Sequence, residues 1–237
     1  MKILTDLHTH SVASTHAFST VQELAQQAEN KGVELFALTD HGPDTPDSPH
    51  KWHFETLQRI PREINGVTLI RGIEANIVDE NGNVNFLRDK RGAIEFVIAS
   101  SHTTPFAPES QEQFSKMWHG VIENPDVDVL GHMVYSRQYM CDLDSIIKSA
   151  KKHNKLIELN NSYAKREHDG TKEIALKCME VGALVSVNSD AHISFEIGGY
   201  EAIYRIFDEI GFPEELVGNL NRERVLKYLY NKKGLVI

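Results

Sequence analysis

The chain contains 12 histidines, and several of them have a spacing that could bind a metal ion. His8 and His10 are two residues apart, so in an extended segment both side chains point to the same side. Asp190 and His192 repeat this spacing near the other end of the chain. Imidazole nitrogens and carboxylate oxygens are ligands that catalytic zinc takes in proteins. The sequence therefore predicts metal-dependent chemistry.

The elements that must position these residues alternate between two kinds. Short apolar runs, typical of strands buried on both faces, occupy residues 3–7, 34–39, 68–73, 95–100, 127–131, 156–160 and 184–188. Helical periodicity lies between them, in residues 21–31, 143–150, 171–182, 203–210 and 225–229. Strands that alternate with helices favour a parallel α/β sheet, closed or nearly closed into a (β/α) barrel. A doubly wound open sheet is the alternative.

All of these predicted strands except the sixth end at or just before a possible metal ligand. The carboxyl ends of barrel strands share one face, so we expect the side chains to meet there. A single histidine after a strand is commonly just a polar residue, but recurrence at six strand ends favours a site. The nine candidate ligands are His8, His10, His16, His41, Glu74, His102, His132, Asp190 and His192.

The number of candidates bears on the number of metals. A catalytic zinc takes about three protein ligands plus water, so nine ligands exceed the need of one ion. Three metals fit if Glu74 bridges two of them. Seven imidazoles and two carboxylates suit zinc, with manganese or iron as alternatives.

The other histidines have different surroundings. His119, His153 and His168 lie in segments rich in Lys and Glu, and we expect them on the solvated surface. His50 and His53 belong to a proline-rich segment that we expect to form a loop over the barrel mouth. There they could contact a substrate or pack within the loop.

Composition limits the partners and the compartment. A length of 237 residues with 41% hydrophobic residues suits a single globular domain over residues 1–237. The net charge of −9 disfavours nucleic acid or an anionic membrane surface as a partner. Cys141 and Cys178 form neither a metal motif nor a disulfide framework, which favours reduced thiols in the cytoplasm. No apolar run approaches the ~18 residues of a membrane span, and no signal peptide is recognisable.

Taken together, these residues resemble the PHP (polymerase and histidinol phosphatase) superfamily. The resemblance covers about residues 3 to 230 and includes the segments 6–11, 39–42 and 190–192 with Glu74, His102 and His132. Further segments are similar to the YcdX-type phosphatases of this superfamily, namely 12–17, 40–43, 50–54, 71–76 and 157–162.

The resemblance implies a distorted (β/α)7 barrel with a trinuclear, usually zinc, phosphoesterase site. It implies one metal on His8, His10, Glu74 and Asp190, a second on Glu74, His102 and His132, and a third on His16, His41 and His192. The corresponding hypothesis is hydrolysis of a small phosphomonoester by a metal-bridging hydroxide. Residues 133–137 depart from the Pro-Gly-Asn-like turn of that branch, so the resemblance does not define the substrate.

No motif for a covalent nucleophile is present, so the metal ligands are the principal catalytic candidates. Asp40 and His53 are further candidates for the acid that protonates the leaving group. Candidate cations for binding phosphate are Arg71, Arg137, Lys165 and Arg166.

Three other functions remain open at this stage. An amidohydrolase-like C–N or C–O hydrolase would leave His16, His41 and His192 without a role. A nuclease or proofreading phosphodiesterase could share the metals, but the net charge of −9 and the lack of a basic track disfavour it. A protein that only binds metal is expected to close the metal's coordination shell with protein ligands.

Overall fold

A parallel sheet of seven strands forms the centre of the computed structural model, which describes residues 1–86 and 93–237. The strands, in spatial order, are β1 (Thr5–Thr9), β2 (Leu35–Leu38), β4 (Val67–Asn76), β5 (Phe96–Ser100), β6 (Val129–Leu130), β7 (Leu156–Asn160) and β8 (Val185–Asn188). Each neighbouring pair along this order is parallel. A short strand not predicted from the sequence, β3 (Glu63–Ile64), pairs antiparallel with β4.

The two edge strands β8 and β1 approach each other without forming a regular ladder. Thr9 and Ala191 make a single parallel bridge, and the His10 amide donates to the Ala191 carbonyl at 2.8 Å. The Leu7 amide donates instead to the side-chain oxygen of Asn188, at 3.1 Å. The sheet is thus nearly closed, and the distorted (β/α)7 barrel is confirmed.

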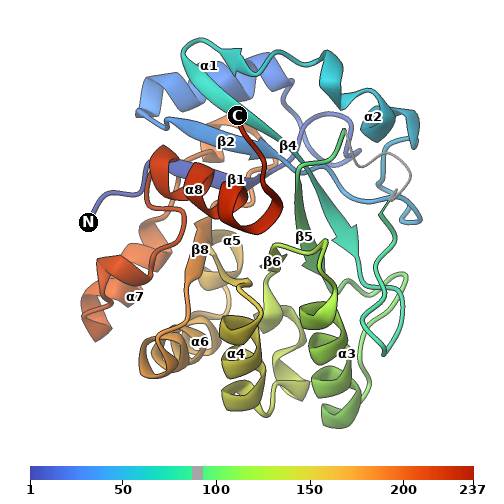
Figure 1. The fold of residues 1–237 in the computed structure, drawn as a ribbon, viewed down its shortest axis with the longest axis vertical. Coiled ribbons are helices and arrows are strands. Elements are labelled where there is room, and N and C mark those ends of the chain that lie inside the picture. The colour runs from blue at the N-terminus through green and yellow to red at the C-terminus, as the bar shows by residue number, and fades with distance from the viewer. Residues whose placement is uncertain (87–92) are drawn as a thin grey trace.

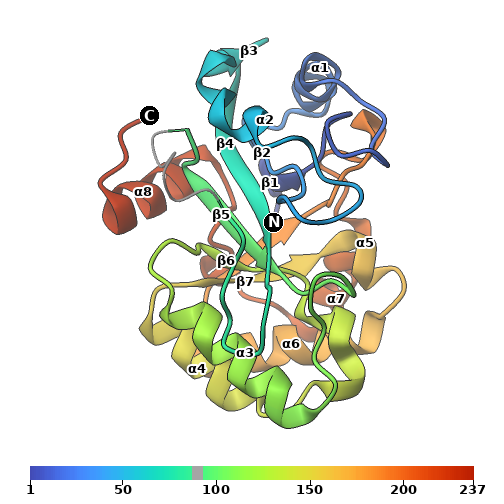
Figure 2. The same cartoon turned by 90° about the vertical axis from the view of Figure 1, so that its right-hand side faces the viewer.

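Helices connect the strands and lie around them. They are α1 (Val21–Lys31), α2 (Trp52–Glu55), α3 (Gln111–Glu123), α4 (Leu143–Lys152), α5 (Asn161–Ala164), α6 (His168–Val181), α7 (Glu201–Ile210) and α8 (Arg222–Lys233). Figures 1 and 2 show α1 on one side of the strands and α3, α4 and α6 on the other. The five predicted helices are present, whereas α3 and the short helices α2 and α5 were not predicted.

Helix α1 shows why the local sequence adopts this form. The Thr20 hydroxyl accepts the Glu23 amide at 3.3 Å, and the Glu23 carboxylate accepts the Thr20 amide at 2.7 Å. This reciprocal capping box satisfies donors that the first helical turn leaves unpaired. Gly32, with φ of 72°, ends the helix in the left-handed conformation that glycine adopts readily.

Two apolar layers hold the barrel together. The larger one lies between the strands and the helices α1, α3, α4, α6 and α7. The smaller one joins strand residues such as Leu7 and Phe96 to Val225 and Leu229 of α8. Figure 1 shows α8 lying across the middle of the view, in front of the strands. This helix therefore covers the amino ends of the strands, which leaves the carboxyl ends to form the site.

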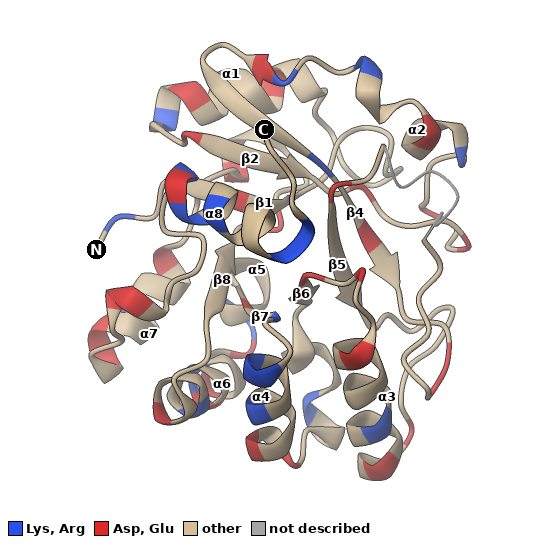
Figure 3. Cartoon of the chain, viewed as in Figure 1, with Lys and Arg blue, Asp and Glu red and all other residues tan. Residues whose placement is uncertain are grey.

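Charged residues of both signs are spread over the outer helices. Figure 3 shows Lys and Arg interspersed with Asp and Glu along α3, α4 and α6. Both cysteines are free, with Cys141 half-buried and Cys178 buried. Among the described residues, every helix is too short or too polar to cross a membrane.

Candidate metal centre

The carboxyl ends of the strands surround a cavity of about 670 Å³. Seven of the nine predicted ligands line it: His16, His41, Glu74, His102, His132, Asp190 and His192. The other two, His8 and His10, have no exposed surface and lie against these residues from β1 and its end. The structure thus brings all nine candidates together.

Glu74, near the end of β4, lies at the centre of the group. Its Oε1 is 2.9 Å from Nε2 of His132 and 3.4 Å from Nε2 of both His8 and His102. Its Oε2 is 2.7 Å from Nδ1 of His41. Burial tends to raise the pKa of Glu74, but the surrounding imidazoles outweigh it and hold that pKa well below its usual range. The carboxylate is therefore ionised and faces five histidines, since Nε2 of His10 also lies 3.7 Å from Oε2.

Asp190 is the second buried carboxylate, and its backbone is unusual. Its φ of 59° is in the left-handed region, which is uncommon for a residue with a side chain and recurs at functional sites. Its Oδ1 lies 3.2 Å from Nε2 of His10 and 3.5 Å from Nε2 of His8. Burial opposes ionisation here too, but His8 and His10 hold the pKa of Asp190 well below its usual range.

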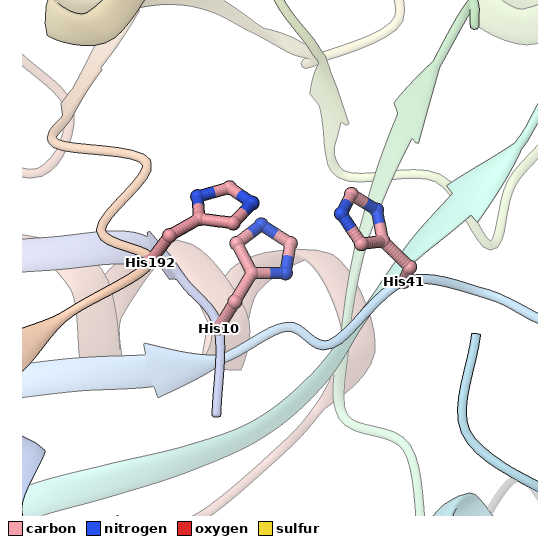
Figure 4. A group of neighbouring side chains, drawn as sticks. All are labelled: His10, His41 and His192. Atoms are coloured by element: carbon pink, nitrogen blue, oxygen red, sulfur yellow. The ribbon is translucent and has the colours of Figure 1, made fainter. Parts of the chain in front are cut away.

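His10 has the protonation state that metal binding requires. Burial, together with the neighbouring His41 and His192, lowers its pKa to about 3. The imidazole is therefore neutral at physiological pH, and a neutral imidazole is the form that binds metal. Figure 4 shows the rings of His10, His41 and His192 gathered close together from different segments of the chain.

A second part of the group lies nearer the solvent. The ring of His16 is 4.5 Å from that of His192 and 5.0 Å from that of His41, between centroids. The carboxylate of Asp47 lies 3.3 Å from Nδ1 of His16 and 3.7 Å from Nε2 of His41. Sequence reasoning missed Asp47 because it lies in the proline-rich loop, where no strand end indicates the direction of a side chain.

Glu158 of β7 holds two candidate ligands in place without lining the cavity. One of its oxygens is 2.7 Å from Nδ1 of His8, and the other accepts the His132 amide at 2.8 Å. The Asn188 side chain also donates to Glu158, at 2.8 Å. This arrangement turns Nε2 of His8 toward Glu74, as carboxylates commonly do for metal-binding histidines.

Sequence reasoning assigned no role to Glu158, because its strand, the sixth predicted one, ends in no candidate ligand. A charged residue inside an otherwise apolar strand was the available signal. His102 is held similarly, since its Nδ1 lies 2.8 Å from Oδ1 of Asn76.

Several buried polar atoms of the group have no hydrogen-bond partner among the described residues. They are Nδ1 of His10, Nε2 of His41 and Nδ1 of His132. Buried polar atoms without partners are costly and therefore rare in folded proteins. Several subsets of three could each hold an ion, including His8 with His10 and Glu74, and His41 with Glu74 and His102. The donor set therefore fits bound zinc.

Asp40 and His53 lie beside the site rather than in it. Asp40 accepts the Ser11 amide at 2.8 Å and the Ser14 hydroxyl at 2.8 Å. Its other oxygen lies 2.9 Å from Nε2 of His53. Neither residue lines the metal cavity. Their contacts hold the segment before His16, and the role of either as an acid stays a prediction.

The four candidate cations have different environments. Arg71 donates to backbone carbonyls outside the cavity, and Lys165 lines a separate pocket. Arg137 is paired with the Glu167 carboxylate at 2.8 Å. Only Arg166 of the four lines the metal cavity in the part of the chain that the structure describes.

The remaining histidines lie away from the cavity. His50, His153 and His168 are exposed or partly exposed, in keeping with a surface position for the last two. His119 is half-buried, with Nε2 3.3 Å from the Ser145 hydroxyl, so it is less solvated than expected.

A nearly closed (β/α)7 barrel with imidazoles and carboxylates gathered at the strands' carboxyl ends defines the class of metal-dependent barrel hydrolases. The PHP domain model matches residues 6–162, which is more than half of the chain. The chain belongs to the PHP family.

Two relatives that match over nearly their full length are both named probable phosphatases. A probable phosphatase of Acetivibrio thermocellus is 38% identical over 98% of both chains. A probable phosphatase of Caldanaerobacter subterraneus is 40% identical over 98% of this chain and 93% of its own. The whole chain, including residues beyond the PHP match, therefore has relatives of the same length.

A solved structure shares the fold. Histidinol phosphate phosphatase from Lactococcus lactis, in complex with zinc, L-histidinol and phosphate, superposes with a TM-score of 0.63. The match covers 93% of this chain and 98% of that one, at 18% identity. At this identity, the comparison supports the fold.

Proposed function

We propose that this PHP-family phosphatase hydrolyses a small phosphomonoester at a centre of three zinc ions. The carrying observation is that nine metal-binding side chains meet at the carboxyl ends of the strands, whereas two catalytic zinc ions take about three protein ligands each. His8, His10, Glu74 and Asp190 would hold one metal, and Glu74, His102 and His132 a second. His16, His41 and His192 would hold the third, with Asp47 as an adjacent carboxylate.

When bound, the metals would polarise the phosphoryl oxygens and lower the pKa of a bound water to about 7. The chain's own residues prepare the site for this chemistry. Glu74 and Asp190 are ionised despite their burial, and the negative charge favours divalent ions. Glu158 fixes the orientation of His8. The cavity of about 670 Å³ is in the size range of small-molecule sites.

The cluster of His16, His41 and His192 counts against the alternative of an amidohydrolase-like C–N or C–O hydrolase. Such an enzyme leaves His16, His41 and His192 without a role, yet these rings lie within 5.8 Å of one another between centroids. A purely metal-binding protein is expected to close its metal shells, whereas this group borders an open cavity.

A nuclease or proofreading phosphodiesterase is less consistent with the charge. The chain carries −9, and basic residues in Figure 3 are interspersed with acidic ones. A backbone of phosphates binds most strongly to a continuous basic track. A single phosphate on a small substrate needs no such track, because the metals would supply local positive charge.

The test compares ester classes in the zinc-loaded protein. We expect hydrolysis of 4-nitrophenyl phosphate, with little turnover of bis(4-nitrophenyl) phosphate, a 4-nitroanilide or a lactone. A chelator should abolish the activity and added zinc should restore it, with manganese and iron(II) compared in parallel. Preferred turnover of the anilide, the lactone or the diester would contradict the proposal.

A further inference from the structure

Asp47 brings to the metal cavity a carboxylate that the proposed ligand sets leave unused. It lines the cavity together with Thr45 and Pro46 of the proline-rich loop. Its Oδ2 lies 3.3 Å from Nδ1 of His16 and 3.7 Å from Nε2 of His41. One ligand atom from each of these three residues lies within 4.8 Å of the other two. A carboxylate and two imidazoles thus meet on the solvent side of the site.

The distances from Asp47 suit a shared metal better than hydrogen bonds. An N–H···O hydrogen bond spans about 2.7–3.2 Å, which both contacts of the Asp47 oxygen exceed. Ligand atoms held 2.0–2.2 Å from a tetrahedral zinc lie roughly 3.3–3.6 Å from one another. The buried Nε2 of His41 also has no hydrogen-bond partner among the described residues. The Asp47 oxygen therefore lies from each imidazole at close to the separation of two ligands of one ion.

The backbone around Asp47 is held to segments that carry other candidate ligands. The Asp47 carbonyl accepts the Thr15 amide at 3.0 Å, which joins the loop to the residue before His16. Where the loop begins, the Asn76 side chain donates to the Gly42 carbonyl at 3.0 Å. Because the backbone is held at both places, the carboxylate can approach or leave a metal by rotation of its own side chain.

The number of ligands indicates what Asp47 would do. With His16, His41 and His192, it raises the protein ligands of the outermost metal from three to four. Four protein ligands fill the tetrahedral shell of a structural zinc, whereas a catalytic zinc keeps one position open. The side chain of Asp47 is 32% exposed and that of His41 is 9% exposed, so the carboxylate has room to rotate into the cavity.

We propose that Asp47 is the fourth ligand of the outermost metal in the free protein, and that the phosphoryl group of the substrate displaces it. This inference rests on the proposed function, because it assigns a role at the third zinc of that site. Asp47 holds the ion while the cavity is empty and gives up its position to a phosphoryl oxygen. The apparent affinity for phosphate is lower by the fraction of molecules in which Asp47 is already displaced.

The direct test is the structure of the zinc-loaded chain, determined with and without inorganic phosphate. Without phosphate, an oxygen of Asp47 should lie about 2.0–2.2 Å from the outermost zinc. With phosphate, a phosphate oxygen should take this position and the Asp47 carboxylate should be turned into the cavity. An Asp47 oxygen that stays on the zinc in both structures, or that contacts zinc in neither, overturns the inference.

Asp47→Asn tests the same role in solution, without turnover. The third zinc, titrated against a competing chelator, should bind at least about tenfold more weakly, since even residues outside the coordination shell change metal affinity 10–100-fold. At saturating zinc, calorimetry should show inorganic phosphate binding about threefold to tenfold more tightly, because it no longer displaces a carboxylate.

Asp44→Asn is the matched control. It removes the same charge from the same loop, but Asp44 is exposed and does not line the metal cavity. Its side chain lies 3.3 Å from the Asn85 amide nitrogen instead. This variant should bind zinc and phosphate like the wild type. Equal changes in Asp44→Asn and Asp47→Asn would reduce the effect to the general charge of the loop and contradict ligation by Asp47.

The outcomes separate this inference from the proposed function. Three zinc ions in the wild type, with unchanged zinc and phosphate affinities in Asp47→Asn, keep the proposed site and overturn the role of Asp47. Weaker zinc binding without tighter phosphate binding overturns the displacement by phosphate. Failure of the wild type to bind a third zinc overturns the proposed function and this inference with it.

Discussion

The two ends of the barrel bury charged side chains in different ways. At the amino end, Asp128 is 0% exposed, with Oδ1 3.1 Å from Nζ of Lys232 and Oδ2 2.5 Å from Nζ of Lys233. Its Oδ2 also accepts the Val97 amide at 2.8 Å. At the carboxyl end, Glu74 faces imidazoles, several of whose buried nitrogens have no hydrogen-bond partner among the described residues.

The difference separates a structural network from a binding site. Lysine brings a charge opposite to that of the carboxylate, and α8 covers the arrangement with Tyr228, which donates to the Asp128 carbonyl at 3.1 Å. The histidines bring ring nitrogens that, when unprotonated, can each donate a lone pair to a metal ion. Charges are thus paired within the protein at one end and prepared for a ligand at the other.

Among substitutions at the carboxyl end, Glu74→Gln should reduce activity the most. The substitution removes the carboxylate proposed to join two metals, and with it several kcal/mol of the stabilisation that the metals would supply. We expect kcat to fall on the order of a thousandfold, since each 1.36 kcal/mol is a factor of ten. Steady-state kinetics with metal analysis tests this, and an active variant with full metal content would contradict the central role of Glu74.

The amino end should lose stability instead of activity. Asp128→Asn leaves Lys232 and Lys233 without their charged partner, and breaking a buried pair costs about 3 kcal/mol. We expect the Tm to fall by roughly 10 °C for a chain of this size. Bound zinc per chain, measured at 25 °C, should match the wild type. A loss of metal with no change in Tm would remove the distinction between the two ends.

Glu158→Gln tests whether a residue that contacts His8 without lining the cavity affects metal affinity. This residue orients His8 but does not line the cavity, so the expected loss is 10–100-fold in metal affinity. Titration with zinc against a competing chelator measures the change. Glu180→Gln, on the surface at the end of α6, is the control and should bind zinc like the wild type. Equal affinity in Glu158→Gln would show that the contact with His8 has no influence on the metal.

The pH dependence of stability should come partly from the amino end. Burial and the neighbouring Lys232 lower the pKa of Lys155 to about 7, against 10.5 for an unperturbed lysine. Between these values the unfolded chain binds a proton that the folded chain releases, so the free energy of unfolding rises with pH from about 7 toward 10. The slope is at most about 1.4 kcal/mol per pH unit.

Urea unfolding at several pH values, in the wild type and in Lys155→Met, measures this contribution. The variant lacks the titrating group but keeps Asp128, Lys232 and Lys233, so the difference between the two curves isolates Lys155. Parallel curves for the two proteins would contradict the lowered pKa.

The sequence was sufficient to predict which side chains meet in the site wherever a regular helix or strand fixes the direction of the side chain. The spacing of His8 and His10 put both on one side of an extended segment, and alternating strands and helices predicted which ends meet. The sequence was insufficient where tertiary contacts determine the position of a side chain or the pairing of two strands. Asp47 reaches the site from a loop, and the closure between β8 and β1 depends on the Asn188 side chain rather than on a ladder.

The cations show the same limit. The sequence could not show which of the four candidate cations lines the metal cavity. Arg71, Arg137, Lys165 and Arg166 differ in the carboxylates, carbonyls and pockets that they meet only in the folded chain. Helix α3 was not predicted, although Phe114, Met117, Trp118 and Val121 have helical spacing and are buried.

The central claim is a centre of three metals at the open end of the barrel, and metal analysis of the purified, zinc-loaded chain tests it most directly. We predict about three zinc ions per chain, falling by one in His16→Ala, while His153→Ala, an exposed histidine outside the site, stays at the wild-type value. A wild-type chain that binds one zinc or none, or a His16→Ala variant with an unchanged count, would contradict it.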